Sequence, residues 1–496
     1  MTVWPNLASM RGTAFLLALL WLAGCGTFRS YDRELGGTIG QLSGGSVDGA
    51  IKTLESNNKG SQKDLLYYFE LGELNRLKDS YDASQKSWMS ADRQVHAWEE
   101  TAKTDPSKLF GNAASFIVND KVRAYEGHDY EKVMLTTRVA LNFLALGDLD
   151  NARVAIKQTH EREAVIADLR GKEVYEVERD AQKRGARTSF KELNGYPVQT
   201  IDNPEVNALK NSYQSALSHY LAGYVYEALG EPSLAAAGYR QAIELQPHQP
   251  LLEQALGGLD QRVAAADDGL TDTLFVVEAG TAPARQSREF PLPIPVNRTM
   301  VLLPISFPVM VPTSADPLPG QLRVDGGEPL PVAAVTSVDL MARRALKDEM
   351  PGIILRAAIR STTKAVAQYE LQHQANQKEN LGLALAGLAV AIGSVITESA
   401  DERTWRALPS LIGVARGRLP PGSHAITVQT SEGAHTAQVT VAGRYAVVGL
   451  RLLRRQLFVQ APVPAMAIPA PGTSPAPPAS ERPATPEEQP LQENPR

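Results

Sequence analysis

Ser361 and Lys364 have the spacing that most directly suggests catalysis in this sequence. They form an S-x-x-K motif, in which a serine nucleophile lies one helical turn before a lysine, as in penicillin-interacting enzymes. Those enzymes also need S-D-N and K-T-G motifs for the proton relay and the substrate carboxylate site, and the sequence contains neither. Because the surrounding residues favour a helix, Ser361 and Lys364 are better explained as two solvent-facing helix positions.

Acid–base and metal chemistry have equally little support. Asp401 and Glu402 are an acidic pair, but Arg403 and Arg406 follow them, which is typical of a capped, salt-bridged helix start. The eight histidines are scattered without metal-site spacing, and a single cysteine cannot supply a structural zinc site. No nucleophile elbow, phosphate-binding loop or dinucleotide fingerprint is present. The sequence therefore predicts a protein that is not an enzyme and carries no cofactor or metal.

The single cysteine, Cys25, lies at the end of an export signal. Arg11 supplies a positive n-region, residues 14–22 form an apolar core too short to span a bilayer comfortably, and Leu-Ala-Gly precedes Cys25 as a cleavage site. This ending resembles the lipobox of bacterial lipoproteins, which implies that Cys25 is acylated and becomes the first mature residue. Gly26, in place of Asp, implies sorting to the outer membrane. The alternative is an ordinary secretory signal with an incidental cysteine.

The composition is that of an ordinary globular protein, but proline is distributed unevenly along the chain. The 496 residues are 43% hydrophobic and 21% charged, and a net charge of −5 gives no field that would attract nucleic acid. The 33 prolines crowd the region after residue 280 and above all the C-terminal tail. We divide the chain into a signal peptide (1–24), a flexible tether (25–60) with room for one short helix at its apolar patch 47–54, a helical domain (61–267), two β-rich parts (268–336 and 409–460) around a helical insertion (337–408), and a disordered Pro/Ala-rich tail (461–496).

Helical periodicity in the domain 61–267 predicts hairpins of the tetratricopeptide type. The units at 63–96 and 136–159 match that pattern in part. The unit at 211–247 matches it best, with pattern residues at Gly223, Tyr226, Ala235, Tyr239, Ala242 and Pro247. Small residues let paired helices approach, aromatics fill the gap between them, and stacked hairpins bury a continuous core. The alternative is a set of generic hairpins with chance glycines.

The first helix of each tetratricopeptide hairpin lines a concave groove, which gives candidate partner-binding residues. These are Leu217, Tyr220, Tyr224 and Glu227 in the best unit and Phe69 and Glu73 in the first unit. Neither unit has the lysine and asparagine set that clamps a peptide carboxylate, so we expect an apolar or helical partner. The alternative is that these aromatics pack against a neighbouring hairpin.

Three further helical stretches lie outside these units. Residues 161–183 are densely charged and predict an exposed helix, which is either a solvated face or a partner-binding face. Residues 337–374 predict two amphipathic segments broken near Pro351. Residues 381–397 carry no charge and favour a buried or oligomer-interface helix over a transmembrane one, because alanine and glycine dominate them.

After about residue 268 the periodicity becomes strand-like. Short apolar or alternating runs, divided by Pro, Gly and Asn, predict strands at 274–278, 289–295, 300–312, 322–324, 331–335, 425–429, 436–441, 446–453 and 457–459. Ser399 and Glu402 predict a capped short helix over 400–408 that Pro409 closes. We therefore predict an α+β fold, in which an array of helical hairpins precedes an antiparallel β-rich domain with a helical insertion.

Several segments together resemble a family of proteobacterial envelope lipoproteins with tetratricopeptide-like repeats. They are 127–134, 220–247, 274–280 and, most specifically, 397–424 with Trp405 and Pro409. The resemblance runs over most of residues 25–460 and implies a protein of the outer membrane that faces the periplasm, with no established activity.

The expected function is a scaffold that binds envelope proteins and is held at the membrane by lipid on Cys25. One alternative is a regulator of a peptidoglycan synthase, by analogy with other lipoproteins that carry repeat domains. Another is a subunit of an oligomeric envelope or export assembly, in which residues 381–397 self-associate or insert in the membrane.

Overall fold

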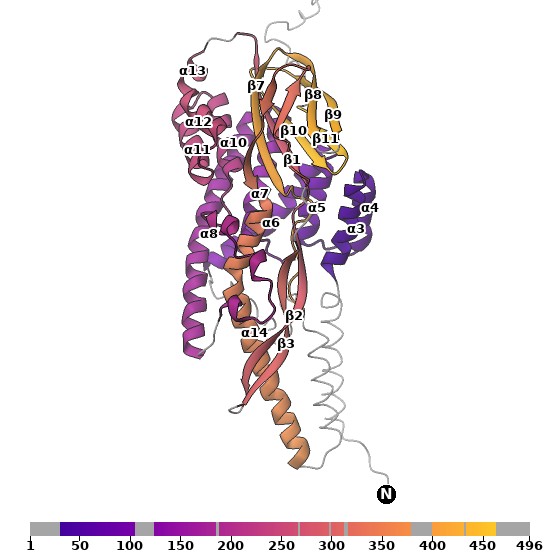
Figure 1. The fold of residues 1–496 in the computed structure, drawn as a ribbon, viewed down its shortest axis with the longest axis vertical. Helices are drawn as coiled ribbons and strands as arrows, with labels where there is room; N and C mark the ends of the chain where they lie inside the picture. Colours follow the sequence, from indigo (N-terminus) through magenta and orange to yellow (C-terminus); the bar gives the residue numbers. More distant parts are fainter. Residues whose placement is uncertain are drawn as a thin grey trace, which may run out of the picture.

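The computed structural model describes residues 30–104, 124–184, 188–265, 268–296, 299–311, 316–377, 399–430 and 433–462. A helical region comes first along the chain (Figure 1). Its helices are α3 (Tyr31–Ser43), α4 (Val47–Asn57), α5 (Leu65–Arg76), α6 (Tyr81–Thr104), α7 (Asp129–Ala145), α8 (Leu149–Arg184), α9 (Pro204–Ala208), α10 (Ala216–Ala228), α11 (Pro232–Leu245), α12 (Pro250–Gly257) and α13 (Leu259–Ala264). The mixed α+β class is therefore confirmed.

Strands and one long helix, α14 (Val338–Gln377), make up the second half. The strands are β1 (Thr271–Ala279), β2 (Ala284–Val296), β3 (Thr299–Val311), β4 (Gln321–Val324), β5 (Pro329–Pro331), β6 (Ala333–Ser337), β7 (Leu411–Leu419), β8 (Gly422–Thr430), β9 (Gly433–Val441), β10 (Tyr445–Leu453) and β11 (Gln456–Gln460). They form a sheet of order β11-β10-β1-β7-β6, a sheet of order β5-β4-β8-β9, and the hairpin β2-β3. The pairings are antiparallel, as predicted, except that β1 runs parallel to β10.

The central strand β1 separates two hydrophobic cores and is buried along its whole length. Leu274 and Val276 belong to the core shared with the helices, whereas Phe275 and Val277 belong to the core between the two larger sheets. This alternation follows from the two-residue period of a strand. The helical region and the five-stranded sheet therefore share one hydrophobic core. The boundary predicted between residues 267 and 268 does not divide the protein into two parts with separate cores.

The predicted flexible tether is wrong for residues 31–57, which form α3 and α4, although α4 matches the one short helix for which the sequence left room. Ser30 caps α3 by accepting a hydrogen bond from the N–H of Arg33, and Ser46 caps α4 in the same way. Leu35, Ile39 and Leu42 lie on one face of α3 and are buried in the shared core. The glycines and serines between them concealed this helical spacing.

The predicted break near Pro351 is also wrong, because α14 continues through that residue. A proline inside a helix costs about 3 kcal/mol and removes one backbone hydrogen bond. Met350, Ile353 and Ile354 are buried on either side of it, so packing of these side chains offsets that cost. The hairpin β2-β3 lies along α14, and both extend away from the two larger sheets (Figure 1).

Three predicted segments lie outside the described residues: the signal peptide with Cys25, the apolar stretch 381–397, and the tail from residue 463. In the part of the chain that the structure describes, no helix combines the length and apolar character that crossing a membrane requires.

In two helical hairpins, a glycine of the first helix packs against an aromatic ring of the second helix. A methyl group at Gly72 of α5 would overlap the Trp88 indole of α6, and one at Gly223 of α10 would overlap the Tyr239 ring of α11. Each glycine therefore lets an aromatic ring lie directly against the backbone of its partner helix. This is the packing that the small-residue and aromatic spacing predicted.

We expect Gly72→Ala to lower the free energy of unfolding by about 1–3 kcal/mol, because the added methyl group displaces the Trp88 ring. Gly171→Ala is the matched control, since nothing lies within 4 Å of the position that its methyl group would take in α8. This control should raise stability by about 0.5–1 kcal/mol. Urea unfolding followed by circular dichroism measures both, and equal midpoints for Gly72→Ala and the parent would contradict the packing argument.

Candidate functional site

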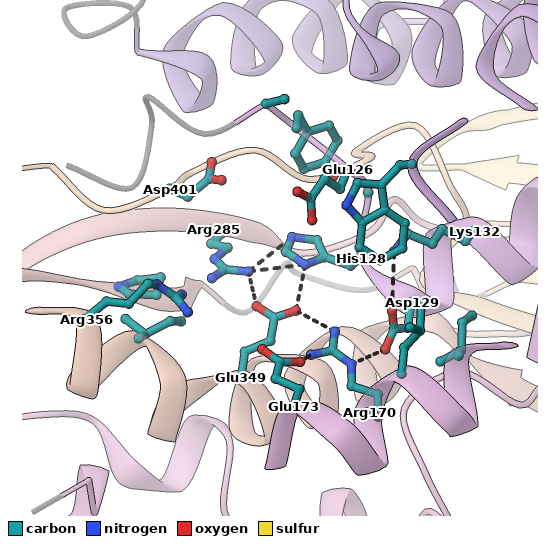
Figure 2. A pocket seen from close by; sticks show the side chains of 18 residues that line it. Glu126, His128, Asp129, Lys132, Arg170, Glu173, Arg285, Glu349, Arg356 and Asp401 are labelled. Carbon is teal, nitrogen blue, oxygen red and sulfur yellow. Dashed lines mark hydrogen bonds and ion pairs between the residues drawn. The ribbon is translucent and has the colours of Figure 1, made fainter. Parts of the chain in front are cut away.

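A charged pocket lies between the start of α7, the helices α8 and α14, the hairpin β2-β3 and residue 401 (Figure 2). Its cavity volume is about 110 Å³. Its ionisable residues are Glu126, His128, Asp129, Lys132, Arg170, Glu173, Arg285, Glu349, Arg356 and Asp401. Its apolar wall comprises Trp98, Ala124, Ile166, Leu169, Pro308 and Ile353. We take this pocket as the candidate functional site.

The start of α7 aims several of these side chains into the pocket. Gly127 has a φ of 77°, a left-handed conformation that glycine adopts without strain. The Glu131 carboxylate accepts a hydrogen bond of 2.9 Å from the N–H of His128, which fixes the first turn of the helix. His128, Asp129 and Lys132 therefore leave the first turn of one helix within a single cavity.

His128 uses both ring nitrogens. Nδ1 lies 2.8 Å from Oε1 of Glu349, and Nε2 lies 3.0 Å from the backbone oxygen of Arg403. A carbonyl oxygen only accepts, so Nε2 carries a proton, and the carboxylate favours a second proton on Nδ1. Burial by itself lowers the pKa of His128, but the charges of Glu349 and Glu131 outweigh burial and raise it. Glu349 therefore favours the protonated form of the ring.

The carboxylate of Glu349, on α14, contacts three basic side chains. Besides His128, the Nη1 atom of Arg285 donates to its Oε2 atom at 3.0 Å, and Nη2 of Arg170 lies 3.9 Å from its Oε1 atom. Burial favours the neutral acid, yet His128 and Arg285 hold the pKa of Glu349 well below its usual value. Glu349 is thus ionised and is the negative centre of the pocket.

A second carboxylate, Asp129, continues the row of charges on the other side of Arg170. Asp129 accepts a hydrogen bond from Arg170, and its Oδ1 atom lies 3.6 Å from Nζ of Lys132. The Lys132 ammonium also lies 3.6 Å from the centroid of the Trp98 ring, a cation–π contact. Burial lowers the pKa of Lys132, although Asp129 favours its charged form. Figure 2 shows this row as a chain of dashed contacts.

The pocket also depends on the segment 399–408, which supplies Asp401 and the carbonyl group that binds His128. The predicted helix over 400–408 is wrong, because this segment has no regular secondary structure. Glu131 accepts a hydrogen bond of 2.7 Å from the N–H of Trp405, and Glu70 accepts from the N–H groups of Arg406 and Ala407. Its amides therefore bond to buried carboxylates from α5 and α7 instead of to carbonyls of its own.

Trp405 anchors the same segment in the hydrophobic core. Its ring stacks on Phe69 with centroids 4.6 Å apart and an angle of 10° between the planes, and meets Trp88 edge-on at 6.2 Å. Asp401 and Arg403 form the expected ion pair, with Nη2 of Arg403 2.7 Å from Oδ2 of Asp401. This pair forms in a buried loop and not at a helix start.

The predicted partner-binding groove is wrong, because its six residues lie in the interior. Leu217, Tyr220, Tyr224, Glu227, Phe69 and Glu73 are each at most 2% exposed. The Tyr224 hydroxyl donates to the backbone oxygens of Asp272 and Ala446, on two neighbouring strands of the five-stranded sheet. Phe69 lies under Trp405, and Glu227 pairs with Arg416 at 2.6 Å. The sheet and the segment 399–408 occupy the position expected for a partner.

Ser361 also differs from its prediction, since it is 8% exposed and not solvent-facing. The side chain of Lys364 lies outside the described residues. Sequence reasoning missed every pocket residue except Asp401, because the others come from six separate stretches of the chain. One local signal could have located the start of α7. Gly127, His128 and Asp129 are followed by Glu131, three residues after His128, and this pattern is typical of a helix start.

Among the described residues, no group of three or more His, Cys, Asp or Glu side chains is arranged to hold a metal ion. Comparison with known proteins found no matching family model, no matching curated protein and no matching solved structure.

We expect the free energy of unfolding to fall on the order of 3 kcal/mol between pH 5 and pH 8 because of Glu70. Burial raises the pKa of Glu70 to about 8, from 4.5 for an exposed carboxyl, although the amides of Arg406 and Ala407 favour its ionised form. The native state therefore binds the extra proton in this window, and stability is lost as pH rises through the folded-state pKa.

Urea unfolding at several pH values measures this contribution. Glu70→Gln, which stays neutral, should lack this part of the pH dependence. Glu100→Gln is the matched control, because Glu100 is solvent-exposed on α6 and its pKa is lowered by Lys103. A Glu70→Gln variant with the pH slope of the parent would contradict the assignment.

Proposed function

We propose that the protein is a lipid-anchored binding protein of the bacterial outer membrane, which faces the periplasm and acts as an interaction scaffold. The observation that carries this proposal is Cys25, the one cysteine of the chain, placed directly after an export signal. Helix α3 begins at Tyr31, only six positions later. At roughly 3.3–3.6 Å per residue, this spacing keeps the start of the folded body within about 20 Å of the anchor.

Such a short connection supports a scaffold role. A lipid anchor confines the body to one membrane face and raises its effective concentration for partners there. The long tether predicted from composition would have allowed much wider sampling, whereas α3 and α4 bring residues 31–57 into the folded body.

The pocket supports binding over catalysis. Both nitrogens of His128 are already bonded within the protein, Nδ1 to Glu349 and Nε2 to the carbonyl of Arg403, so neither is free to act on a bound molecule. Among the described residues that line the pocket, none is a serine, threonine or cysteine that could act as a nucleophile.

With the predicted groove filled, a partner has to contact an outer surface. Val174 and Tyr175 are neighbours on α8 and are 52% and 63% exposed. They lie in the second half of α8. An exposed tyrosine beside an apolar residue, on a helix that is otherwise densely charged, offers rigid contact area. We propose this surface as the partner contact.

Cys25→Ser should move the protein from the outer-membrane fraction to the soluble periplasmic fraction, because the acyl chains supply the membrane affinity. Cell fractionation and immunoblotting measure this distribution, and metabolic labelling with a palmitate analogue checks for the lipid itself. Ser61→Cys introduced into Cys25→Ser is the control, since a cysteine at this exposed position should not restore anchoring. Membrane retention of the Cys25→Ser variant would contradict the anchor and direct attention to residues 381–397.

Replacing Val174 with Ser and Tyr175 with Ala together should reduce the yield of a crosslinked partner at least several-fold, while the protein stays folded and membrane-bound. Crosslinking in intact cells, followed by mass spectrometry of the captured proteins, measures this yield. Val154→Ser is the matched control, because Val154 is similarly exposed in the first half of α8. Unchanged capture by the double variant would rule out this surface.

A further inference from the structure

We propose that the hairpin β2-β3 lies against the lipid bilayer, with its distal half in the interfacial region of the membrane. The distal half comprises residues 291–296 of β2 and 299–304 of β3. This inference goes beyond the scaffold function, because it assigns a lipid-binding surface in addition to the acyl chains on Cys25. Three observations carry it: an apolar hairpin that leaves the body, prolines that remove edge donors, and a base that lies beside the start of α3.

The distal half is apolar by composition on both faces. Thr299 is its only polar residue, and it contains no charge. Successive residues of a strand belong to opposite faces, so this composition leaves neither face polar. At the base of the hairpin, Phe290 and Ile305 are buried in the shared core. The next pair outward, Pro291 and Pro304, is exposed, so the core no longer covers the hairpin there.

The rest of the chain offers little apolar surface to cover this half. The hairpin and α14 both extend away from the two larger sheets (Figure 1). The last ten residues of α14, QYELQHQANQ, are mostly polar. An apolar surface of this extent marks a membrane contact or a protein contact.

Prolines distinguish between these two contacts. In an antiparallel pair, residues that exchange both backbone hydrogen bonds alternate with residues whose N–H groups point outward. Pro291 and Pro304 stand opposite each other, and two prolines cannot exchange such bonds, so theirs is an outward-pointing pair. The other prolines of the hairpin share this alternation: Pro293, Pro295 and Pro308. From residue 291 to residue 295, the outer edge of β2 therefore has no N–H donor.

Such an edge suits a lipid surface better than a neighbouring strand. A strand pairs poorly with an edge that lacks donors, whereas an apolar medium penalises every donor that has no partner. The edge of β3 keeps outward N–H groups at Met300 and Leu302, which share the alternation of Pro304. We therefore place the hairpin in the interfacial region, where water and headgroups reach these groups, and not across the bilayer.

The lipid anchor lies within reach of the hairpin. Asp32, in the first turn of α3, accepts a hydrogen bond of 3.0 Å from Nε2 of Gln286, near the base of β2. Asp32 follows Cys25 by seven positions, which span at most about 25 Å. Strand β2 continues for ten positions beyond Gln286, which is about 33 Å. A bilayer that holds the acyl chains can therefore also meet the distal half, and this step alone rests on the proposed anchor.

The test is flotation of the full chain carrying Cys25→Ser with excess vesicles of phosphatidylethanolamine and phosphatidylglycerol. This variant has no acyl chain, so the hairpin is tested separately from the anchor. Shallow insertion is weak and reversible, so a protein that washes off cell membranes during fractionation should still float with excess vesicles. Absence of flotation would overturn the proposal.

Two added carboxylates test whether the hairpin makes this contact. Ile294→Asp together with Leu302→Asp should reduce the bound fraction roughly fivefold or more, because a charge is penalised at an apolar contact. Val154→Asp together with Leu234→Asp is the matched control, since it adds the same charge at exposed apolar positions of α8 and α11. Equal flotation of the two folded variants would overturn the proposal.

A fluorescent label locates the contact without altering the apolar surface by charge. Since Cys25 is the only cysteine, Cys25→Ser allows a single introduced thiol to carry the dye NBD. On adding vesicles, NBD at Met300→Cys should emit at shorter wavelength and be quenched by lipids spin-labelled near the headgroup. Thr436→Cys is the control, because Thr436 is exposed on β9. Unchanged emission at Met300→Cys would overturn the proposal, and a shift that needs only more protein would replace it with contact between two copies.

Discussion

Two buried carboxylates, Glu70 and Glu131, bond to the backbone of the segment 399–408, and much of the structure depends on these bonds. This segment crosses the hydrophobic core without regular secondary structure, so its amides need partners from elsewhere in the chain. Glu70 lies 336 positions from Arg406, whose N–H it accepts. The bonds therefore join the second helical hairpin from the N-terminus to the C-terminal half and also fix the Arg403 carbonyl that binds His128.

A second set of buried charges joins α7 to the five-stranded sheet. Glu278 of β1 and Arg451 of β10 stand opposite each other in the parallel pair, and Arg138 of α7 bonds to Glu278. Burial alone would raise the pKa of Glu278, but Arg138 and Arg451 hold it below its usual value. Arg451 also donates to the backbone oxygen of Ala407. Buried pairs of this kind define position more than they add stability. Arg138 thus joins the middle of α7 to the sheet.

The sequence predicted elements well where the signal is local. Glycine–aromatic spacing located the hairpins that contain Gly72–Trp88 and Gly223–Tyr239, because both partners lie within a few helical turns of each other. Alternating apolar residues located most strands for the same reason. Predictions failed where a distant segment decides the outcome. Pro351 does not end α14 because neighbouring side chains pack around it, and residues 400–408 are not helical because Glu70 and Glu131 compete for their amides.

By itself, the sequence determined the α+β class, the helical hairpins, most strands and the expectation of a lipid anchor at Cys25. These depend on short-range periodicity or on a contiguous motif. Only the tertiary structure decided which faces are exposed: Tyr220 and Tyr224 lie under the sheet, and residues 31–57 pack against the body. It alone assembled the charged pocket, because His128, Arg170, Arg285 and Glu349 lie on four different elements. Exposure and convergence are properties of long-range contacts, which no local pattern encodes.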